Sequence, residues 1–441
     1  MKIYHKLTLA TTMAVLLCTS CEPIFPLDGG DELENLTMEY TIRQARSQKR
    51  GISGPMQLQT DVTLLAPGVC WQYNWGADVP FADVMASNGM VFYPMAWNNH
   101  FGAEKIRAYK TAHPEAEYIL AYNEPNLTDQ ANMTPAVAAS YWPELKNFAK
   151  EVGLKLISPA VNYGTLSGYH DPIVWLDEFF ACEGVSLDDV DGIAVHCYMP
   201  NGEALKSFIR RFDKYGKPIY MTEFCHASGN ITNDVLSQQN YMADVLNYME
   251  CDDKVGGYAW FMSRGSGSWK AISLLNTNAK EPALTELGAE YVYFSSFDKN
   301  CYYPTGEAFP AAHYRSNNAE ALAEGTKWEG MPKIKASTDV TGPIVLSDFY
   351  ATFMWVEYGI EVTKSGTYEL LARYSNLADG TFTFSIDGSE AFTYTFPSTN
   401  NDTVWKTANA GEVTLTEGRH ILRVALAQGR GNFNWFCLRE K

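Results

Sequence analysis

The stretch ILAYNEPN, residues 119–126, gives the first indication of the fold. Its first half is apolar and aromatic like a buried strand, and the run stops abruptly at Glu124. A second stretch, PIYMTEF at residues 218–224, reaches Glu223 in the same way. A carboxylate at the end of a buried strand is costly unless it faces a cleft or is paired. We therefore interpret the two glutamates as a pair that works together.

Strand runs of this kind alternate with helical stretches between about residues 48 and 297. Seven runs lie at residues 69–75, 91–97, 118–122, 154–161, 192–198, 218–224 and 257–262. One helix is predicted to begin at Thr134, an N-cap residue that Pro135 follows at the first helical position. Strands joined by helical crossovers predict a parallel sheet. An eighth strand at residues 49–52 would close it into a (β/α)8 TIM barrel of the usual size, about 250 residues.

A doubly wound open sheet is the alternative to the barrel, although no Gly-rich phosphate loop follows any of these strands. After residue 297 the pattern changes, and we interpret residues 298–305 as a linker. Residues 306–441 contain alternating strands separated by turn signals such as Asp387-Gly388, which is typical of a β-sandwich. The predicted fold class is α/β: a TIM barrel at residues 48–297, followed by an all-β sandwich (jelly-roll) domain.

The N-terminus has the features of a targeting segment. A positive end and a short apolar run precede Ser20-Cys21, and the whole resembles a bacterial lipoprotein signal peptide over residues 1–21. Cys21 is then the expected lipidation site, and the acidic residues 22–47 are expected to form a tether. These features predict a lipid-anchored protein of the cell envelope, at the outer membrane and either surface-exposed or facing the periplasm. A plain secretory signal is the alternative.

Composition narrows the classes of partner. The net charge of -17 argues against nucleic acid, because phosphate binding needs a basic surface. Aromatic residues make up 13% of the chain, and such a surplus often lines sugar sites, although each aromatic alone can equally be core. The seven cysteines beyond residue 21 are odd in number and have no repeated spacing. We therefore expect neither a disulfide framework nor a zinc site.

Paired carboxylates that flank a bond are the chemical groups of glycoside hydrolysis. In a TIM barrel the working residues sit at the C-terminal ends of strands, where Glu124 would end the fourth and Glu223 the seventh. His196 and Tyr198 share one face at the end of the sixth strand and could bind sugar hydroxyls or orient Glu223. The two glutamates supply the acid, the base and the nucleophile, so no cofactor or metal is expected.

Eight motifs occur in order across residues 49–263 and resemble glycoside hydrolase family 128, a family known for β-1,3-glucan hydrolysis. They are KRG at 49–51, YNWG at 73–76, YPMAW at 93–97, NEPN at 123–126, ANMTP at 131–135, VHCY at 195–198, PIYMTEF at 218–224 and YAWF at 258–261.

This resemblance implies roles for individual residues. Glu124 would be the general acid/base and Glu223 the nucleophile of a retaining enzyme, and Asn123 would contact the sugar 2-hydroxyl. An acid must be protonated near neutral pH, so we expect a raised pKa for Glu124. The other expected substrate-binding residues are Asn126, His196, Tyr198, Tyr73, Trp75, Trp97 and Trp260, the last as a stacking floor under the cleaved sugar.

The C-terminal domain resembles carbohydrate-binding module family 6, through AHY at 312–314, WVEY at 355–358, GTY at 366–368, IDG at 386–388, VWKT at 404–407, EGRH at 417–420 and NFNW at 432–435. The resemblance implies that Asn432 contributes to a sugar site. The aromatic expected shortly before Trp405 is replaced by Asn400-Asn401-Asp402. The module could therefore bind elsewhere or support the barrel structurally.

The sequence thus predicts a retaining glycoside hydrolase that cleaves β-1,3-glucan and acts within the chain, with the glucan or its oligosaccharides as its partner. Two alternatives stay open: a non-catalytic surface glycan-binding lipoprotein, and a retaining glycosidase for another β-linked glycan, since specificity lies in loops. A structural cell-surface protein with a decayed barrel is a weaker third.

Overall fold

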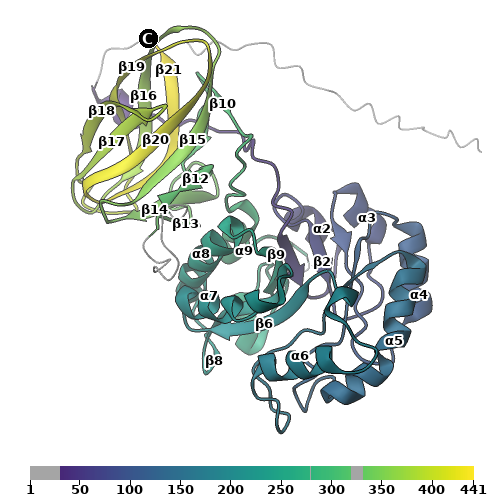
Figure 1. The fold of residues 1–441 in the computed structure, drawn as a ribbon. Coiled ribbons are helices and arrows are strands. Elements are labelled where there is room, and N and C mark those ends of the chain that lie inside the picture. Colours follow the sequence, from purple (N-terminus) through teal and green to yellow (C-terminus); the bar gives the residue numbers. More distant parts are fainter. Residues whose placement is uncertain (1–29, 279, 319–330) are drawn as a thin grey trace, which may run out of the picture.

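The computed structural model describes residues 30–278, 280–318 and 331–441. A strand barrel surrounded by helices carries a β-sandwich on one side, next to helices α8 and α9 (Figure 1). The expected signal peptide and Cys21 lie outside the described residues. Among the residues that are described, no helix combines the length and apolar character needed to cross a membrane.

Eight parallel strands form the barrel: β1 (Arg50–Ser53), β2 (Trp71–Tyr73), β3 (Val91–Phe92), β4 (Tyr118–Leu120), β5 (Lys155–Ile157), β6 (Ile193–Met199), β7 (Ile219–Ser228) and β9 (Val255–Phe261). β1 pairs in parallel with both β2 and β9, which closes the ring at this point. Isolated parallel bridges link β3 to β4 at Met95–Leu120 and β5 to β6 at Ile157–Gly192. The predicted barrel is confirmed, including its eighth strand, and the open-sheet alternative is wrong.

Helices cover the outside of the barrel: α2 (Gln59–Leu65), α3 (Ala82–Ser87), α4 (Ala103–Ala112), α5 (Pro135–Val152), α6 (Pro172–Ala181), α7 (Gly202–Arg210), α8 (Val235–Cys251) and α9 (Glu286–Tyr293). Thr134 caps α5 as expected, because its side chain accepts a hydrogen bond from the Val137 amide at 3.3 Å. Asp234 caps α8 in the same way. A short 3-10 helix, η3 (Gly267–Ile272), follows β9 at the C-terminal end of the strands.

The sandwich consists of two antiparallel sheets. One contains β15 (Trp355–Val362), β17 (Gly380–Ile386), β18 (Ser389–Phe396) and β20 (Gly418–Gly429), with β10 (Tyr303–Pro304) and β12 (Ser316–Asn317) on β15. The other contains β13 (Lys333–Ala336), β14 (Ile344–Phe349), β16 (Gly366–Ser375), β19 (Lys406–Leu415) and β21 (Gly431–Glu440), with β11 (Ala308–Pro310) on β21. Their apolar faces meet in a core rich in phenylalanine.

The segment expected to be a free tether is packed in its described part. Helix α1 (Gly30–Glu34) is followed by Leu36, Met38 and Tyr40, which pack against Trp435 on the sandwich. The tether prediction is therefore wrong for this part, because its apolar residues cover an apolar face. The expected linker at residues 298–305 also contains a strand, since β10 pairs with β15.

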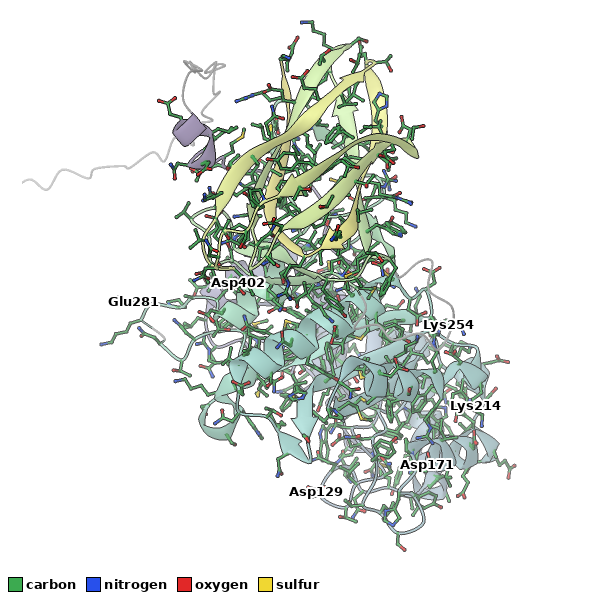
Figure 2. The ribbon with its side chains drawn as sticks, turned by 90° about the vertical axis from the view of Figure 1, so that its left-hand side faces the viewer. Asp129, Asp171, Lys214, Lys254, Glu281 and Asp402 are labelled. Atoms are coloured by element: carbon green, nitrogen blue, oxygen red, sulfur yellow. The ribbon has the colours of Figure 1, made fainter. Side chains whose placement is uncertain are left out.

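Barrel and sandwich meet along α8 and α9 through polar contacts. The Tyr314 hydroxyl donates to Asn247 of α8 at 2.5 Å, and Lys333 of β13 forms an ion pair with Asp244 of the same helix. Figure 2 shows Asp402 of the sandwich at this junction, with Glu281 of the barrel on the same side and Asp129 at the end of the barrel away from the sandwich. Asp402 lines a cavity with Leu236 and Glu286 at the starts of α8 and α9, so the junction reaches the side of the barrel where the strands end and the helices begin.

Candidate active site

Glu124 and Glu223 come together at the C-terminal end of the barrel strands. Glu223 lies within β7, and Glu124 follows β4, where its amide donates to the Ala160 carbonyl at 2.9 Å. Both residues are buried, at 7% and 5% exposure. One oxygen of each carboxylate and a ring nitrogen of His196 lie within 4.8 Å of one another. The predicted pair therefore forms one site with His196, and these three ligand types could also bind a metal ion.

The backbone of Glu124 is in a left-handed conformation, with a φ of 43°. This conformation is unfavourable for a residue with a side chain, by about 1–3 kcal/mol, and it persists only where the surroundings enforce it. Two backbone hydrogen bonds enforce the conformation here. The Asn123 amide donates to the Trp97 carbonyl, and the Glu124 amide donates to the Ala160 carbonyl. Such strained positions are concentrated at functional sites.

Three donors surround the carboxylate of Glu223. The Tyr73 hydroxyl at 3.0 Å and the Trp75 indole at 2.7 Å donate to Oε1, and the Tyr198 hydroxyl donates to Oε2 at 2.5 Å. Burial and the charge of Glu223 raise the pKa of both tyrosines well above the ordinary value, so they remain donors. An ionised carboxylate accepts hydrogen bonds and gives none, so this environment suits the ionised form of Glu223.

Glu124 has a different environment. Its Oε1 accepts one hydrogen bond from His196 Nδ1 at 2.9 Å and another from the side-chain amide of Asn162 at 3.2 Å. Burial pushes the pKa of Glu124 upward, but the hydrogen bond and charge of His196, together with Asn162, outweigh it and hold the pKa below its ordinary value. The expectation of a raised pKa is therefore wrong for the free protein, because an imidazole lies beside this carboxylate.

His196 is fully buried between the two glutamates. Its Nδ1 lies 2.9 Å from Glu124 Oε1 and 3.5 Å from Glu223 Oε2. Within the described part of the chain, its Nε2 has no hydrogen-bond partner. Burial lowers the pKa of His196, but the charge of Glu223 and the hydrogen bond and charge of Glu124 raise it above the ordinary value overall. The imidazole is therefore placed to carry a proton rather than to contact solvent.

Two expected substrate-binding residues lie away from the site. Trp260 is completely buried, donates its indole N–H to the Ile272 carbonyl and packs against Tyr291 of α9. The prediction that it forms the sugar floor is wrong, because successive strand residues point to opposite faces. Its neighbour Phe261 is half-buried and faces Trp75 and Tyr198 instead.

Asn126 is the second of these residues, and it has a structural role. It is fully buried, and its side chain donates to the carbonyl of Asn162 at 2.6 Å. It therefore holds the segment that carries Asn162 against Glu124. Asn123 is nearly buried, and it donates to Gln130 at 3.2 Å. Trp97 is half-buried against the barrel core.

Three further residues belong to this site and were not predicted from the sequence: Asn162, Phe261 and Trp269. Asn162 directly follows the fifth predicted strand, so the rule that strand ends carry working residues could have found it. Trp269 lies in η3 with 45% of its surface exposed, and its ring is 5.7 Å from that of Phe261. Nothing in its local sequence distinguishes it, because the turn after β9 brings it to the site.

The expected sugar residue of the module uses its side chain within the protein. Asn432 accepts a hydrogen bond from the Asp348 amide at 3.1 Å and donates to Ser375 at 3.4 Å. With Trp405 it lines a cavity of about 350 Å³ to which Leu236 and Gln239 of α8 also contribute. The cavity therefore belongs to the junction between the module and the barrel.

Comparisons with known proteins agree with this geometry. The profile of the family described as glycosyl hydrolase catalytic core matches residues 56–291, and that of carbohydrate binding module family 35 matches residues 329–438. The module therefore resembles family 35 rather than the expected family 6. A curated relative, alkali-sensitive linkage protein 1 of Schizosaccharomyces pombe, is 24% identical over 238 residues. The match covers 51% of this chain and only 40% of that protein.

Solved structures with similar barrels include two from bacteria. A subgroup II endo-β-1,3-glucanase of glycoside hydrolase family 128 from Pseudomonas viridiflava is 35% identical, with a TM-score of 0.52, and the match covers 56% of this chain and 98% of that one. The corresponding protein from Sorangium cellulosum is 32% identical, with a TM-score of 0.49 and the same coverage. The chain thus belongs to the glycosyl hydrolase catalytic core family and, through its barrel, to glycoside hydrolase family 128.

Proposed function

We propose that this protein hydrolyses β-1,3-glucan within the chain and with retention of anomeric configuration. The observation that carries the proposal is the approach of a Glu124 oxygen to a Glu223 oxygen within 4.8 Å. Carboxyl groups of retaining enzymes lie about 5–5.5 Å apart, whereas inverting enzymes need about 6.5–9.5 Å for an intervening water. The short separation favours direct attack by one carboxylate.

The environments of the two glutamates support separate roles. Glu223, with three donors and an ionised carboxylate, attacks the anomeric carbon and forms a covalent glycosyl-enzyme. Glu124 gives a proton to the leaving oxygen and then accepts one from the water that releases the sugar. No step requires a metal or cofactor.

The proposed substrate rests on the relatives and on the aromatic lining. The Pseudomonas viridiflava and Sorangium cellulosum proteins are described as endo-β-1,3-glucanases. Trp75, Phe261 and Trp269 form a continuous aromatic edge beside Glu223. Sugar rings have apolar faces that pack on such side chains, so this edge offers a binding surface for a glucan chain.

Product analysis with linear β-1,3-glucan tests the proposal. The protein comprising residues 22–441 is expected to release a ladder of oligosaccharides, with the β-anomer appearing first in proton NMR spectra. Glu223→Ala should still bind glucan but release nothing, and a chelator should leave the wild-type activity unchanged.

Other outcomes would contradict the proposal in distinct ways. A single small product would indicate action from the chain end, and an α-anomer would indicate inversion. Binding without products from the wild type would favour the glycan-binding alternative, and products from a different β-linked glucan alone would reassign the substrate.

We also propose that Cys21 carries a lipid that anchors the protein in the outer membrane. The targeting segment described above supports this proposal. Cys21→Ala in the full chain is expected to release the protein from the membrane fraction. Retention of that variant in the membrane fraction would contradict the anchor.

A further inference from the structure

The general acid faces a difficulty in the free protein. A retaining enzyme begins its cycle with a proton ready for the leaving oxygen and with an ionised nucleophile. The imidazole of His196 holds the pKa of Glu124 below its ordinary value, so Glu124 alone does not keep that proton. Nδ1 of His196, however, lies 2.9 Å from Glu124 Oε1, within direct proton-transfer reach.

We propose that His196 stores the catalytic proton on Nδ1 and delivers it through Glu124 to the glycosidic oxygen. This inference rests on the function proposed above and adds a positioning residue to it. His196 has no route to exchange the proton elsewhere within the described structure, because its side chain is fully buried and its Nε2 has no partner there. Among the described residues, the polar neighbours of Nδ1 are the two catalytic carboxylates.

The charged groups that act on the imidazole come from two neighbouring elements. Glu124 follows β4 and Glu223 belongs to β7, while His196 itself lies on β6. Tyr73 of β2 and Tyr198 of β6 hold Glu223 as neutral donors, and Asn162 after β5 is a neutral donor to Glu124. Two carboxylates and one imidazole therefore share one proton in addition to the N–H of the neutral imidazole.

The proton balance of the cycle is closed. When the sugar displaces water from Glu124, the buried ion pair loses solvation, and the proton moves from His196 Nδ1 to the Glu124 carboxylate. The bond between the anomeric carbon and the leaving oxygen then breaks, its electron pair stays on that oxygen, and the oxygen takes the proton. Glu223 forms the new bond to the anomeric carbon.

The second half of the cycle returns the proton to His196. Glu124 takes a proton from water, the water oxygen bonds to the anomeric carbon, and Glu223 leaves as a carboxylate. The proton returns from Glu124 to His196 Nδ1. The first transfer also removes a positive charge that lies 3.5 Å from Glu223 Oε2, so the nucleophile gains reactivity as the acid becomes protonated.

The test compares two substrates that differ in their need for an acid. One is a β-1,3-linked glucose hexasaccharide, and the other is the 2,4-dinitrophenyl glycoside of the β-1,3-linked disaccharide, whose leaving group departs without a proton. For His196→Gln we expect kcat/KM on the hexasaccharide to fall about 10²-fold, the lower range for general acid catalysis. On the dinitrophenyl glycoside the change should stay within a few-fold.

The pH profile gives a readout that a structural role would not move. The raised pKa of His196 places the alkaline limb of wild-type kcat/KM on the hexasaccharide above pH 6.5, its ordinary value. His196→Gln should move this limb to lower pH, because a carboxyl group then holds the proton alone. Asn162→Ala is the matched control: it removes the other donor to the same oxygen, so it should lower activity without moving the limb to lower pH.

A direct measurement covers the case in which His196→Gln fails to fold. Besides His420, whose pKa the hydrogen bond to Asp387 also raises, nitrogen NMR of histidine-labelled wild type should contain one buried imidazole, that of His196, with both nitrogens protonated above pH 6.5. Glu124→Gln should remove that signal. An unmoved alkaline limb, equal losses on both substrates, or a neutral His196 in the wild type would overturn the inference. Failure of the wild type on both substrates would instead refute the proposed function.

Discussion

At the scale of single residues, the position of a ring relative to the strand decides whether it meets the substrate. The sequence analysis chose Trp260, yet Phe261 lies at the site and Trp260 lies in the outer core. Strand β9 was correctly located, but the face to which each of its residues points was not, because an all-apolar strand gives no alternation from which to assign its faces. The two glutamates could be predicted because a charge that ends such a strand stands out against it.

Trp269 provides a test at this scale. It is exposed next to Phe261 and lies in a helical turn that leaves its indole available to a sugar ring. Aromatic contacts of this kind contribute about 0.5–1.5 kcal/mol, so Trp269→Ala should raise KM for the hexasaccharide about 2- to 10-fold. The kcat should change little, because Trp269 contacts neither glutamate. Tyr141→Ala, another exposed aromatic on the outer helix α5, is the control, and an equal effect there would refute the assignment.

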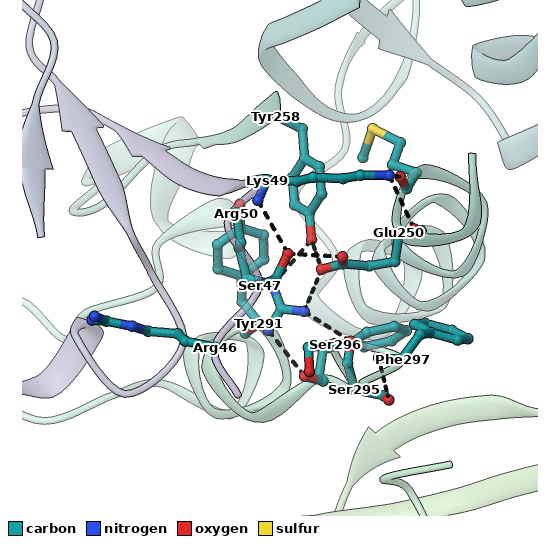
Figure 3. A network of polar contacts seen from close by, with 12 residues as sticks. Arg46, Ser47, Lys49, Arg50, Glu250, Tyr258, Tyr291, Ser295, Ser296 and Phe297 are labelled. Atoms are coloured by element: carbon teal, nitrogen blue, oxygen red, sulfur yellow. Dashed lines mark hydrogen bonds and ion pairs between the residues drawn. The ribbon is translucent and has the colours of Figure 1, made fainter. Parts of the chain in front are cut away.

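At the scale of elements, the start of β1 joins three parts of the barrel. Arg50 is fully buried, and it donates to Glu250 of α8 at 2.6 Å, to Tyr258 of β9 at 3.0 Å and to the carbonyl of Ser295 beyond α9 at 2.9 Å (Figure 3). Lys49 donates to the last carbonyls of α8, where a positive charge is favourable. This part of the KRG motif is therefore structural, far from the strand ends that carry the site.

Removing one member of this buried pair should be costly. Arg50→Ala leaves Glu250 buried without its cation, and breaking such a pair typically destabilises a protein by about 3–5 kcal/mol. Urea denaturation of the variant should show a correspondingly lower free energy of unfolding. The control is Arg107→Ala, which breaks an exposed pair with Glu151 and should change the free energy of unfolding far less. Equal losses in the two variants would contradict the role of Arg50.

The elements themselves were predicted unevenly, for a physical reason. Helix α5 begins at the expected residue, because an N-cap and the proline after it mark its start. Strand β21 was not predicted. Its outward residues Trp435 and Cys437 are covered by Leu33, Leu36 and Met38 from the N-terminal segment. A strand buried on both faces has no polar alternation, and its cover lies almost 400 positions away in the sequence.

At the scale of the whole molecule, the module is fixed to the barrel rather than loosely linked. The N-terminal segment crosses the sandwich before the barrel begins, and α8 contacts β13 through Asp244 and Asn247. The module is therefore placed beside the face where the strands end, and the cavity lined by Asn432, Trp405 and Leu236 lies between the two domains.

Glu290 provides a test of this junction. It lies on α9 and is fully buried where that helix meets the sandwich, and burial raises its pKa well above the ordinary value despite the charge of Lys335. Its folded-state pKa exceeds its unfolded-state pKa, so the unfolded chain releases the proton first. The free energy of unfolding must therefore fall as pH rises above the unfolded-state pKa.

Glu290→Gln removes this loss, and we expect it to raise the melting temperature more at pH 8 than at pH 5. Glu281→Gln, at an exposed position, should have the same small effect at both pH values. An equal effect of Glu290→Gln at pH 5 and pH 8 would mean that the junction does not keep this carboxyl protonated.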